Sequence, residues 1–424
     1  MSSPVTMTSV ATPSAIGNRR LCFALFLLLF CAGAGLRITA LRGVAVRSPD
    51  ERTYTWEAAQ VADRGLSGFQ SLVAAFQSRP SLFAYPSPAR AGYIEALALV
   101  MRLTGRRDAE AGALLSCIAD IGTLLLVGLI GWRFFSPPAG VIAVLLYAAS
   151  PPVLAMGRRG WQEPCVTFLA ALLLLVALEA DRRPSRWWFA VVAGLLAALH
   201  ITIKETAMVA AALILLLLLV ALVRRRAWRQ VALLLASAAA GTLLCALWLA
   251  HMLGGFAVWM AFTSHTVAAV GSGPYALAWQ SGSPFTWFQM LCGTDPVLVP
   301  LGLAGLGLAA CSAQRLRNPA ILWPAILAAA FLILPLSSAH HLNLRFAAPA
   351  FVPLALLGAG TACSIAAAFT RSLPGNEAQW TRRAALAVLL CAAFINVLSF
   401  RERFVQTDLQ DLSSGMILDA PVQP

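Results

Sequence analysis

Four short clusters of charged and polar residues interrupt a chain that is otherwise strongly apolar. They lie at residues 47–57, 157–164, 200–206 and 337–345. The clusters contain carboxylates, which can accept a proton, together with arginines and a lysine, which can bind phosphate. This combination fits group transfer from a phosphate donor, because a leaving phosphate needs its growing charge stabilised and an acceptor hydroxyl needs a base.

Three carboxylates in these clusters are candidate catalytic residues: Asp50, Glu51 and Glu163. Pro49 ends the preceding segment, and we expect Asp50 to cap a short helix that runs to about Arg64. The structural alternative is that these acids only stabilise the amino termini of helices. The functional hypothesis is that one of them acts as a general base at the membrane surface.

The basic residues Arg158, Arg159, Lys204 and Arg345 are candidate ligands of the donor phosphate. Lys204 is the sole lysine among 31 basic residues, and it lies between two long apolar runs. The alternative for each residue taken alone is a side chain that extends to the lipid headgroups. Four such residues, accompanied by acids and histidines, favour a shared anionic ligand.

Three further residues could make polar contacts at such a site: His340, His341 and Glu205. Adjacent histidines do not share a helix face, so at most one of them could ligate a metal. The cysteine and histidine spacings of known metal sites do not occur, and we expect no metal ligand set. Cys165 and Cys292 could pair if both face an oxidising compartment, but the spacing does not decide this.

Composition places these clusters in a membrane protein. Of the 424 residues, 59% are hydrophobic and 12% are charged, and the mean hydropathy is +0.77. Soluble domains carry about 25% charged residues, which excludes an ordinary soluble fold, a disordered chain and a disulfide scaffold. The net charge of +13 does not indicate nucleic-acid binding, because the arginines lie in short loops between apolar runs.

Eleven apolar runs approach the length of about 20 residues that a membrane span needs. Residues 93–103 form a shorter run with Glu95 and Arg102, and we expect this run to lie in the membrane interface. The first span resembles a signal peptide, but the orientation of the chain favours an uncleaved span. The predicted spans are 21–40, 111–132, 139–156, 164–180, 187–203, 206–223, 231–253, 296–313, 320–337, 346–370 and 384–400.

The arginines predict the orientation. With eleven spans and the amino terminus inside, every cytoplasmic loop is basic, whereas counting 93–103 as a span moves these loops outside. Residues 1–20 are then cytoplasmic, 21–400 form the membrane domain, and the tail at 401–424 is external. The larger external loops lie at about 41–110 and 254–295, and all four clusters lie on the external side.

Two features within these regions have alternative interpretations. The loop at 254–295 carries Trp259, His265, Trp279 and Trp287, whose rings suit either a sugar face or the interfacial aromatic belt. Asp120 lies in the middle of a span, which makes it a functional hypothesis by default. Because it lies too deep for transfer at the surface, we expect a structural hydrogen bond or a contact near the donor tail.

The order of several motifs resembles the GT-C glycosyltransferases that use polyprenyl-phosphate sugars. These include the protein O-mannosyltransferases and the bacterial aminoarabinose transferases of lipid A. The resemblance covers about residues 20–360, and order and spacing carry it more than any single motif. The matching stretches are 49–51, 85–88 followed by 93–105, 132–135, 139–140, 150–151, 163–164, 204–206 and 345–353.

The resemblance implies an inverting transferase in the bacterial cytoplasmic membrane with its site on the periplasmic face. Asp50 would be the general base, Glu163 a second active-site acid, and the basic residues would hold the lipid phosphate. The implied partners are a polyprenyl-phosphate-linked sugar, membrane lipids and a glycan, lipid or protein acceptor, without nucleic acid. Some relatives bind a divalent cation through a glutamate where this chain has Ala84 and Tyr85, so a cation is left open.

The main alternative is a transporter or flippase of lipid-linked sugars. Transporters often contain internal repeats, and the apolar pattern here has no convincing two-fold repeat. A flippase also needs polar groups along a path to the cytoplasm, and the sixth to eighth spans are almost purely apolar. A non-catalytic scaffold would leave the four external clusters unexplained.

Overall fold

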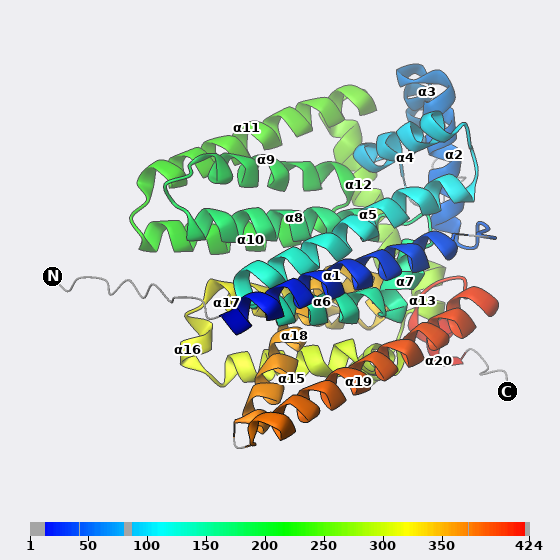
Figure 1. Ribbon diagram of the computed structural model, residues 1–424. Helices are drawn as coiled ribbons and strands as arrows, with labels where there is room; N and C mark the ends of the chain where they lie inside the picture. Colours follow the sequence, from blue (N-terminus) through cyan, green and yellow to red (C-terminus); the bar gives the residue numbers. More distant parts are fainter. Residues whose placement is uncertain (1–12, 42, 80–86, 372, 420–424) are drawn as a thin grey trace.

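The computed structural model describes residues 13–41, 43–79, 87–371 and 373–419. Over these residues the chain is almost wholly helical, and one isolated antiparallel bridge joins Asn343 to Ser413. Long helices lie side by side, with α2, α3 and α4 at one end of the bundle (Figure 1). This end is called the loop end below, and α1 begins at the other end.

The predicted spans are all helical. Within the described residues, eight helical segments are long and apolar enough to cross a membrane, or ten if each of two bent pairs is one span. The shorter helix α9 (Trp188–Ile203) accounts for the remaining predicted run. The fold class, an all-α polytopic membrane protein, is therefore confirmed. The eight segments contain α1 (Pro13–Thr39), α5 (Ala109–Ile130), α8 (Glu163–Arg182), α10 (Ala207–Arg224), α11 (Trp228–Leu253), α17 (Pro319–Ile333), α18 (Ala348–Thr370) and α19 (Gly375–Phe400).

The two bent pairs change direction close to the loop end. Helices α6 (Pro137–Ala148) and α7 (Pro151–Gly157) meet at 65°, because Pro151 and Pro152 begin a new helix. Helices α14 (Pro284–Thr294) and α15 (Leu298–Ala310) meet at 119°. The predicted loop at 254–295 is therefore mostly helical, since it also contains α12 (Phe256–Ser272) and α13 (Pro274–Trp279).

Three short helices, α2 (Pro49–Arg64), α3 (Leu66–Ser78) and α4 (Ala91–Thr104), follow the first long helix. They share an apolar core in which Tyr54, Phe69 and Tyr93 are buried, together with side chains from α11 and α12. Helix α4 contains the run predicted to lie in the interface. The long connection after α1 thus carries packed juxtamembrane helices, as expected.

The amino terminus of α2 differs from the prediction. Ser48 is the N-cap, and its side chain accepts a hydrogen bond from the backbone nitrogen of Glu51 at 3.3 Å. The Glu51 carboxylate in turn accepts one from the Ser48 backbone at 3.0 Å. The prediction that Asp50 caps this helix was wrong, because Pro49 occupies the first helical position and the capping box precedes it. The Asp50 carboxylate is therefore left for other partners.

The chain returns to the loop end after α19. A π-helical turn, η6 (Arg401–Gln406), ends that helix, and α20 (Ser414–Asp419) follows. Between them, Leu412 accepts a hydrogen bond from the backbone of Leu344, and Ser414 donates one to Leu342, both at 3.0 Å. The segment 407–413, called the tail segment below, is thereby fixed against η5 (Leu344–Ala347).

Candidate active site

One residue from each of the four sequence clusters enters a single buried group at the loop end. Asp50 comes from α2, Glu163 from the first turn of α8, Lys204 from the end of α9, and Arg345 from η5. All four side chains are buried. This group is called the outer cluster, and only the tertiary fold can assemble it, since 295 positions separate Asp50 from Arg345.

Arg345 connects the two acids of the outer cluster. Its Nη2 donates to Asp50 Oδ2 at 2.7 Å, and its Nε donates to Glu163 Oε1 at 3.3 Å. Lys204 Nζ donates to the same Glu163 oxygen at 2.5 Å. The second oxygen of Glu163 is buried and has no hydrogen-bond partner among the described residues. Two cations therefore share one carboxylate oxygen while its neighbour stays unpaired.

The local backbone structure positions the side chains of the outer cluster. Glu163 begins α8 beside Pro164, where the partial positive charge of a helix amino terminus favours a carboxylate. Lys204 ends α9 in an extended conformation. The Asn343 side chain accepts a hydrogen bond from the Arg345 backbone at 3.0 Å and so caps η5. The Arg345 guanidinium also lies 4.5 Å from the centre of the Trp161 ring, a stacking contact that fixes its plane.

Arg90, which the sequence analysis missed, lies in a second buried group beside the first. Its guanidinium donates to Tyr54 Oη at 2.5 Å, to Gln162 at 2.9 Å and to Glu205 at 2.8 Å. Burial raises the pKa of Glu205, but the attraction of Arg90 outweighs it and the pKa falls below its usual range. Burial instead raises the pKa of Glu57 well above its usual range, against the opposing attraction of Arg90.

Arg158 and Arg159 face the tail segment. Arg159 donates to Asp408 at 2.8 Å and to the Leu409 carbonyl at 2.7 Å. Arg158 donates to backbone carbonyls of Ala40 and Phe404. These contacts join the loop before α8 to the carboxyl-terminal segment, and neither arginine forms an ion pair with Asp50 or Glu163.

Glu51 lies between these elements. Besides its part in the capping box, its Oε1 accepts a hydrogen bond from the Gly160 backbone at 3.2 Å, and its Oε2 lies 3.5 Å from Arg159. These contacts hold the amino terminus of α2 against the loop before α8. The geometry therefore gives Glu51 a different environment from that of Asp50.

Asp408 and Asp411 of the tail segment were also missed by the sequence analysis. Asp411 lies 3.5 Å from Arg345, the longest of the ion pairs that this arginine makes. Their position in the sequence gives no signal, because the acids follow the last span and resemble a solvated tail. Arg90 had a weak signal, since it directly precedes the apolar run that forms α4.

The remaining predicted residues lie at the margin. His340 and His341 belong to η4 (Ala339–His341), and the His341 ring is 5.9 Å from that of Phe346. Burial lowers the pKa of His341, and the neighbouring His340 lowers it further. His340 Nδ1 and His341 Nε2 are both buried without a partner in the described part of the chain.

The donor set does not fit a metal ion. The described residues contain no group of three or more His, Cys, Asp or Glu side chains that could hold one. Asp50 and Glu163 already face Arg345 and Lys204, so a cation would have to displace these partners. Ala84, Tyr85 and Pro86 of the proline-bearing motif lie outside the described residues. We therefore derive no catalytic step through a metal.

The pairing of Cys165 with Cys292 does not occur in the structure, where both are free thiols. The aromatic residues of the 254–295 stretch differ among themselves. Trp287 is fully buried and donates to the Leu332 carbonyl at 2.9 Å, which is a structural role. Trp279 is 41% exposed and remains available to a ligand.

Comparison with known proteins identifies the architecture. Residues 92–251 match the model of a family described as dolichyl-phosphate-mannose-protein mannosyltransferase. The crystal structure of ArnT from Cupriavidus metallidurans bound to undecaprenyl phosphate superposes with a TM-score of 0.57 at 17% identity, covering 95% of this chain and 76% of that one. The chain has the GT-C fold. A sequence comparison with curated proteins gives no match.

Archaeal relatives share the same GT-C architecture. The Archaeoglobus fulgidus oligosaccharyltransferase superposes with a TM-score of 0.62 at 16% identity, over 93% of this chain and 56% of its own length. A second structure of that organism's enzyme, AglB, holds an inhibitory peptide and a dolichol-phosphate, with a TM-score of 0.56 at 14% identity. The family match contains Glu163 and Lys204 but neither Asp50 nor Arg345, so the last two rest on the geometry of this chain.

Proposed function

We propose that the chain is an inverting glycosyltransferase that moves a sugar from a polyprenyl-phosphate donor to a glycan, lipid or protein acceptor. The observation that carries this proposal is the outer cluster, in which two acids and two cations from distant elements meet at one end of a GT-C fold. The relatives solved with undecaprenyl phosphate and dolichol-phosphate support a lipid-phosphate donor.

The proposed reaction is a single displacement. The acceptor oxygen attacks the anomeric carbon of the sugar on the face opposite the phosphate. The bond between that carbon and the phosphate oxygen breaks, and its electron pair leaves with the polyprenyl phosphate. The proton of the acceptor hydroxyl passes to the Asp50 carboxylate, which is the general base. One displacement inverts the configuration at the anomeric carbon.

Lys204 and Arg345 bind the donor phosphate in this proposal and stabilise the charge that develops on it. Both cations are paired with carboxylates, so the phosphate competes for their N–H groups. The contact of Arg345 with Asp411 at 3.5 Å is the weakest of these pairs by geometry and the first to exchange. Glu163 positions both cations, and Arg345 couples the phosphate site to the base because it also holds Asp50.

The other predicted residues act at a distance from the reacting atoms. Arg158 and Arg159, which the sequence suggested as phosphate ligands, hold the tail segment through Asp408, and a direct phosphate contact would need that segment to move. Glu51 positions α2, which carries the base. His340, His341 and Glu205 border the site and provide polar contacts.

We further propose that the site faces the periplasm of a bacterial cytoplasmic membrane. The argument is the arginine distribution: basic loops gather at the end of the bundle where α1 begins, opposite the outer cluster. Alkaline phosphatase fused after Arg64, Gly160 or Ser338 should be active, and fusions after Arg183, Arg226 or Arg317 inactive. Equal activity of the fusions at Arg64 and Arg183 would overturn the orientation.

The activity is tested with purified protein, a panel of polyprenyl-phosphate hexoses and pentoses, and mixed glycan, lipid and peptide acceptors. The expected result is release of polyprenyl phosphate for at least one donor, with a product of inverted anomeric configuration and a release by Asp50→Asn that is roughly 100-fold slower or more. Vesicles that contain the protein provide the test of a flippase. Donor that crosses the bilayer without release of polyprenyl phosphate would overturn the transferase proposal.

A further inference from the structure

A cavity lies at the end of the bundle opposite the outer cluster, between the start of α1 and the junction of α5 with η2 (Gly131–Phe135). Its volume is about 480 Å³. Arg19 lies near the cavity end of α1 and Thr39 ends that helix at the loop end, and a rise of 1.5 Å per residue places the two residues about 30 Å apart. The cavity is therefore separate from the proposed transfer site. Its lining residues are Arg19, Arg20, Phe23, Phe26, Leu129 and Trp132.

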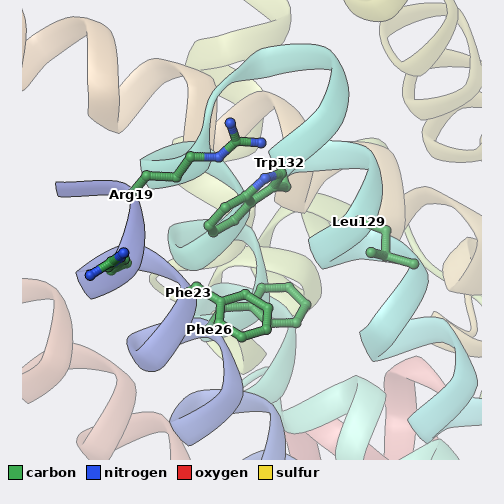
Figure 2. Close-up of a pocket in the computed structure, with 6 residues that line it drawn as sticks. Arg19, Phe23, Phe26, Leu129 and Trp132 are labelled. Atoms are coloured by element: carbon green, nitrogen blue, oxygen red, sulfur yellow. The ribbon is translucent and has the colours of Figure 1, made fainter. Parts of the chain in front are cut away.

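The walls of the cavity are apolar and aromatic. Figure 2 shows Arg19 extending from α1 toward Trp132, with Phe23 and Phe26 along the same helix and Leu129 on α5. The Trp132 ring meets the rings of Phe23 and Phe26 edge to face, at 6.3 and 6.1 Å. Phe23 is 54% exposed and Leu129 41% exposed, so the slot opens to the side of the bundle.

Local structure builds this slot. The π-helical turn η2 follows α5 directly and carries Trp132, and turns of this kind are frequent at functional sites. A Cβ atom at Gly128 would lie 2.3 Å from the Phe26 ring, so glycine allows that ring to pack into α5. Phe26 then forms the floor, and the more exposed Phe23 and Leu129 form the open side.

The two arginines at the mouth have no anion in the described chain. Arg19 and Arg20 are exposed and make neither an ion pair nor a side-chain hydrogen bond with any described residue. Two acids at this end are already paired, Glu179 with Arg133 and Arg183, and Asp181 with Arg225. Glu377, in the first turn of α19, forms no ion pair with Arg19 or Arg20. Residues 1–18 contain no acidic residue that could neutralise the pair. No acid of the described residues neutralises these two arginines, so both are available to an anionic ligand from outside the chain.

We propose that this cavity binds an anionic glycerophospholipid from the leaflet at that end of the bundle. Arg19 and Arg20 hold its phosphate, and one acyl chain lies in the slot of Phe23, Phe26, Leu129 and Trp132. Arginines at a helix end beside an apolar slot suit this ligand, because the guanidinium groups reach the headgroup level while the slot takes the chain. The inference does not depend on the proposed transferase activity.

The test is native mass spectrometry of the full-length protein with phosphatidylglycerol, phosphatidylcholine and undecaprenyl phosphate supplied separately and in competition. We expect one phosphatidylglycerol to be retained in preference to phosphatidylcholine. Arg19→Gln combined with Arg20→Gln should weaken this retention by about 30-fold, since two basic residues near an anionic headgroup are lost. Leu129→Trp should also weaken it by filling the slot, although both arginines remain.

The matched control is Arg224→Gln combined with Arg229→Gln, which removes two exposed arginines from the same end but away from the cavity. This variant should retain the lipid as the parent protein does, and thermal unfolding checks that every variant is folded. Equal retention in the parent, the Arg19/Arg20 variant and Leu129→Trp would overturn the site. Displacement of phosphatidylglycerol from this cavity by undecaprenyl phosphate would overturn the proposed occupant.

Discussion

Two groups of buried charge in this chain differ in how completely their polar atoms are paired. The inner group consists of Arg37, Asp120 and Tyr147, within the bundle. Arg37 donates to Asp120 at 2.6 Å and to the carbonyls of Gly33, Tyr147 and Ala148, while the Tyr147 hydroxyl donates to the other Asp120 oxygen at 2.9 Å. Both oxygens of Asp120 have partners, and the arginine covers the end of α6 where it bends into α7.

The outer cluster is paired less completely. Glu163 offers one oxygen to two cations and leaves the other unpaired, and the Gln162 amide nitrogen and one Glu57 oxygen beside it are buried without partners among the described residues. Buried polar atoms without partners are costly, and such atoms gather where a ligand can satisfy them. Burial of charge is thus common to both groups, whereas incomplete pairing belongs to the outer cluster and supports the proposal that a ligand binds there.

Matched substitutions in the two groups should have opposite effects. Asp50→Asn should lower turnover roughly 100-fold or more, since it removes the base but keeps the size of the side chain. Its melting temperature should change little compared with that of Asp120→Asn, which weakens an ion pair inside the bundle and should keep turnover per folded molecule. The two variants are compared by their turnover at saturating donor and by their melting temperatures in thermal unfolding. Near-normal turnover in Asp50→Asn would reduce Asp50 to a partner of Arg345.

The cations provide the next comparison. Lys204→Met and Arg345→Met should each weaken donor binding by roughly ten- to hundredfold, because a charge-assisted hydrogen bond is worth about 1.5–3 kcal/mol. Arg345→Lys should restore only part of this, since an ammonium group cannot reproduce the bidentate fork. Arg37→Met should instead lower stability by about 3–5 kcal/mol without weakening donor binding. Donor binding is measured by titration of each folded variant. Unchanged binding in both Lys204→Met and Arg345→Met would contradict the proposed phosphate site.

More of the fold than of the candidate site could be predicted from the sequence. Long apolar runs and basic loops predicted every span, because the bilayer imposes length and hydropathy on each segment separately. The α6–α7 bend was absent from the prediction. Pro151 and Pro152 begin the new helix there, but Arg37 stabilises the bend by donating to the carbonyls of Tyr147 and Ala148, more than 100 positions away. Such a contact has no local pattern in the sequence.

The candidate site shows the same limit. Asp50, Glu163, Lys204 and Arg345 could be selected because each breaks an apolar pattern at a span end, and the structure brings them together. Their catalytic roles remain predictions. Asp411 was missed because its position depends on the return of the tail segment to η5, which backbone hydrogen bonds fix. The helix cap is Ser48 and not Asp50, because Pro49 takes the first helical position and Glu51 completes a capping box with Ser48.

Asp411 offers a smaller test of incomplete pairing. If its carboxylate competes with the donor phosphate for Arg345, Asp411→Asn should tighten donor binding about threefold, because the neutral amide binds the guanidinium less strongly than the carboxylate does. Asp108→Asn is the matched control, since Asp108 is an exposed helix cap that asparagine can replace. The two variants are compared by their dissociation constants for the donor. Weaker binding in Asp411→Asn would show that Asp411 supports Arg345 instead of competing with the phosphate.

The smallest expected effect is a pH dependence of donor binding through Lys204. Burial lowers the pKa of Lys204, and the attraction of Glu163 opposes this only in part. The ammonium group therefore loses its proton below the usual pKa of about 10.4. Since the phosphate needs the charged form, the KM for donor should rise as the pH increases through this lowered pKa. Lys204→Arg should move the rise to higher pH, because arginine stays protonated.

Stability should change in the opposite direction over the same pH range. Between the lowered pKa of folded Lys204 and its usual value, the unfolded chain binds more protons than the folded chain. The contribution of Lys204 to the free energy of unfolding must then rise with pH in this window. Loss of donor binding without loss of melting temperature would assign the alkaline change to the phosphate site. Parallel loss of both in the parent protein and in Lys204→Arg would attribute it to unfolding and contradict the assignment to Lys204.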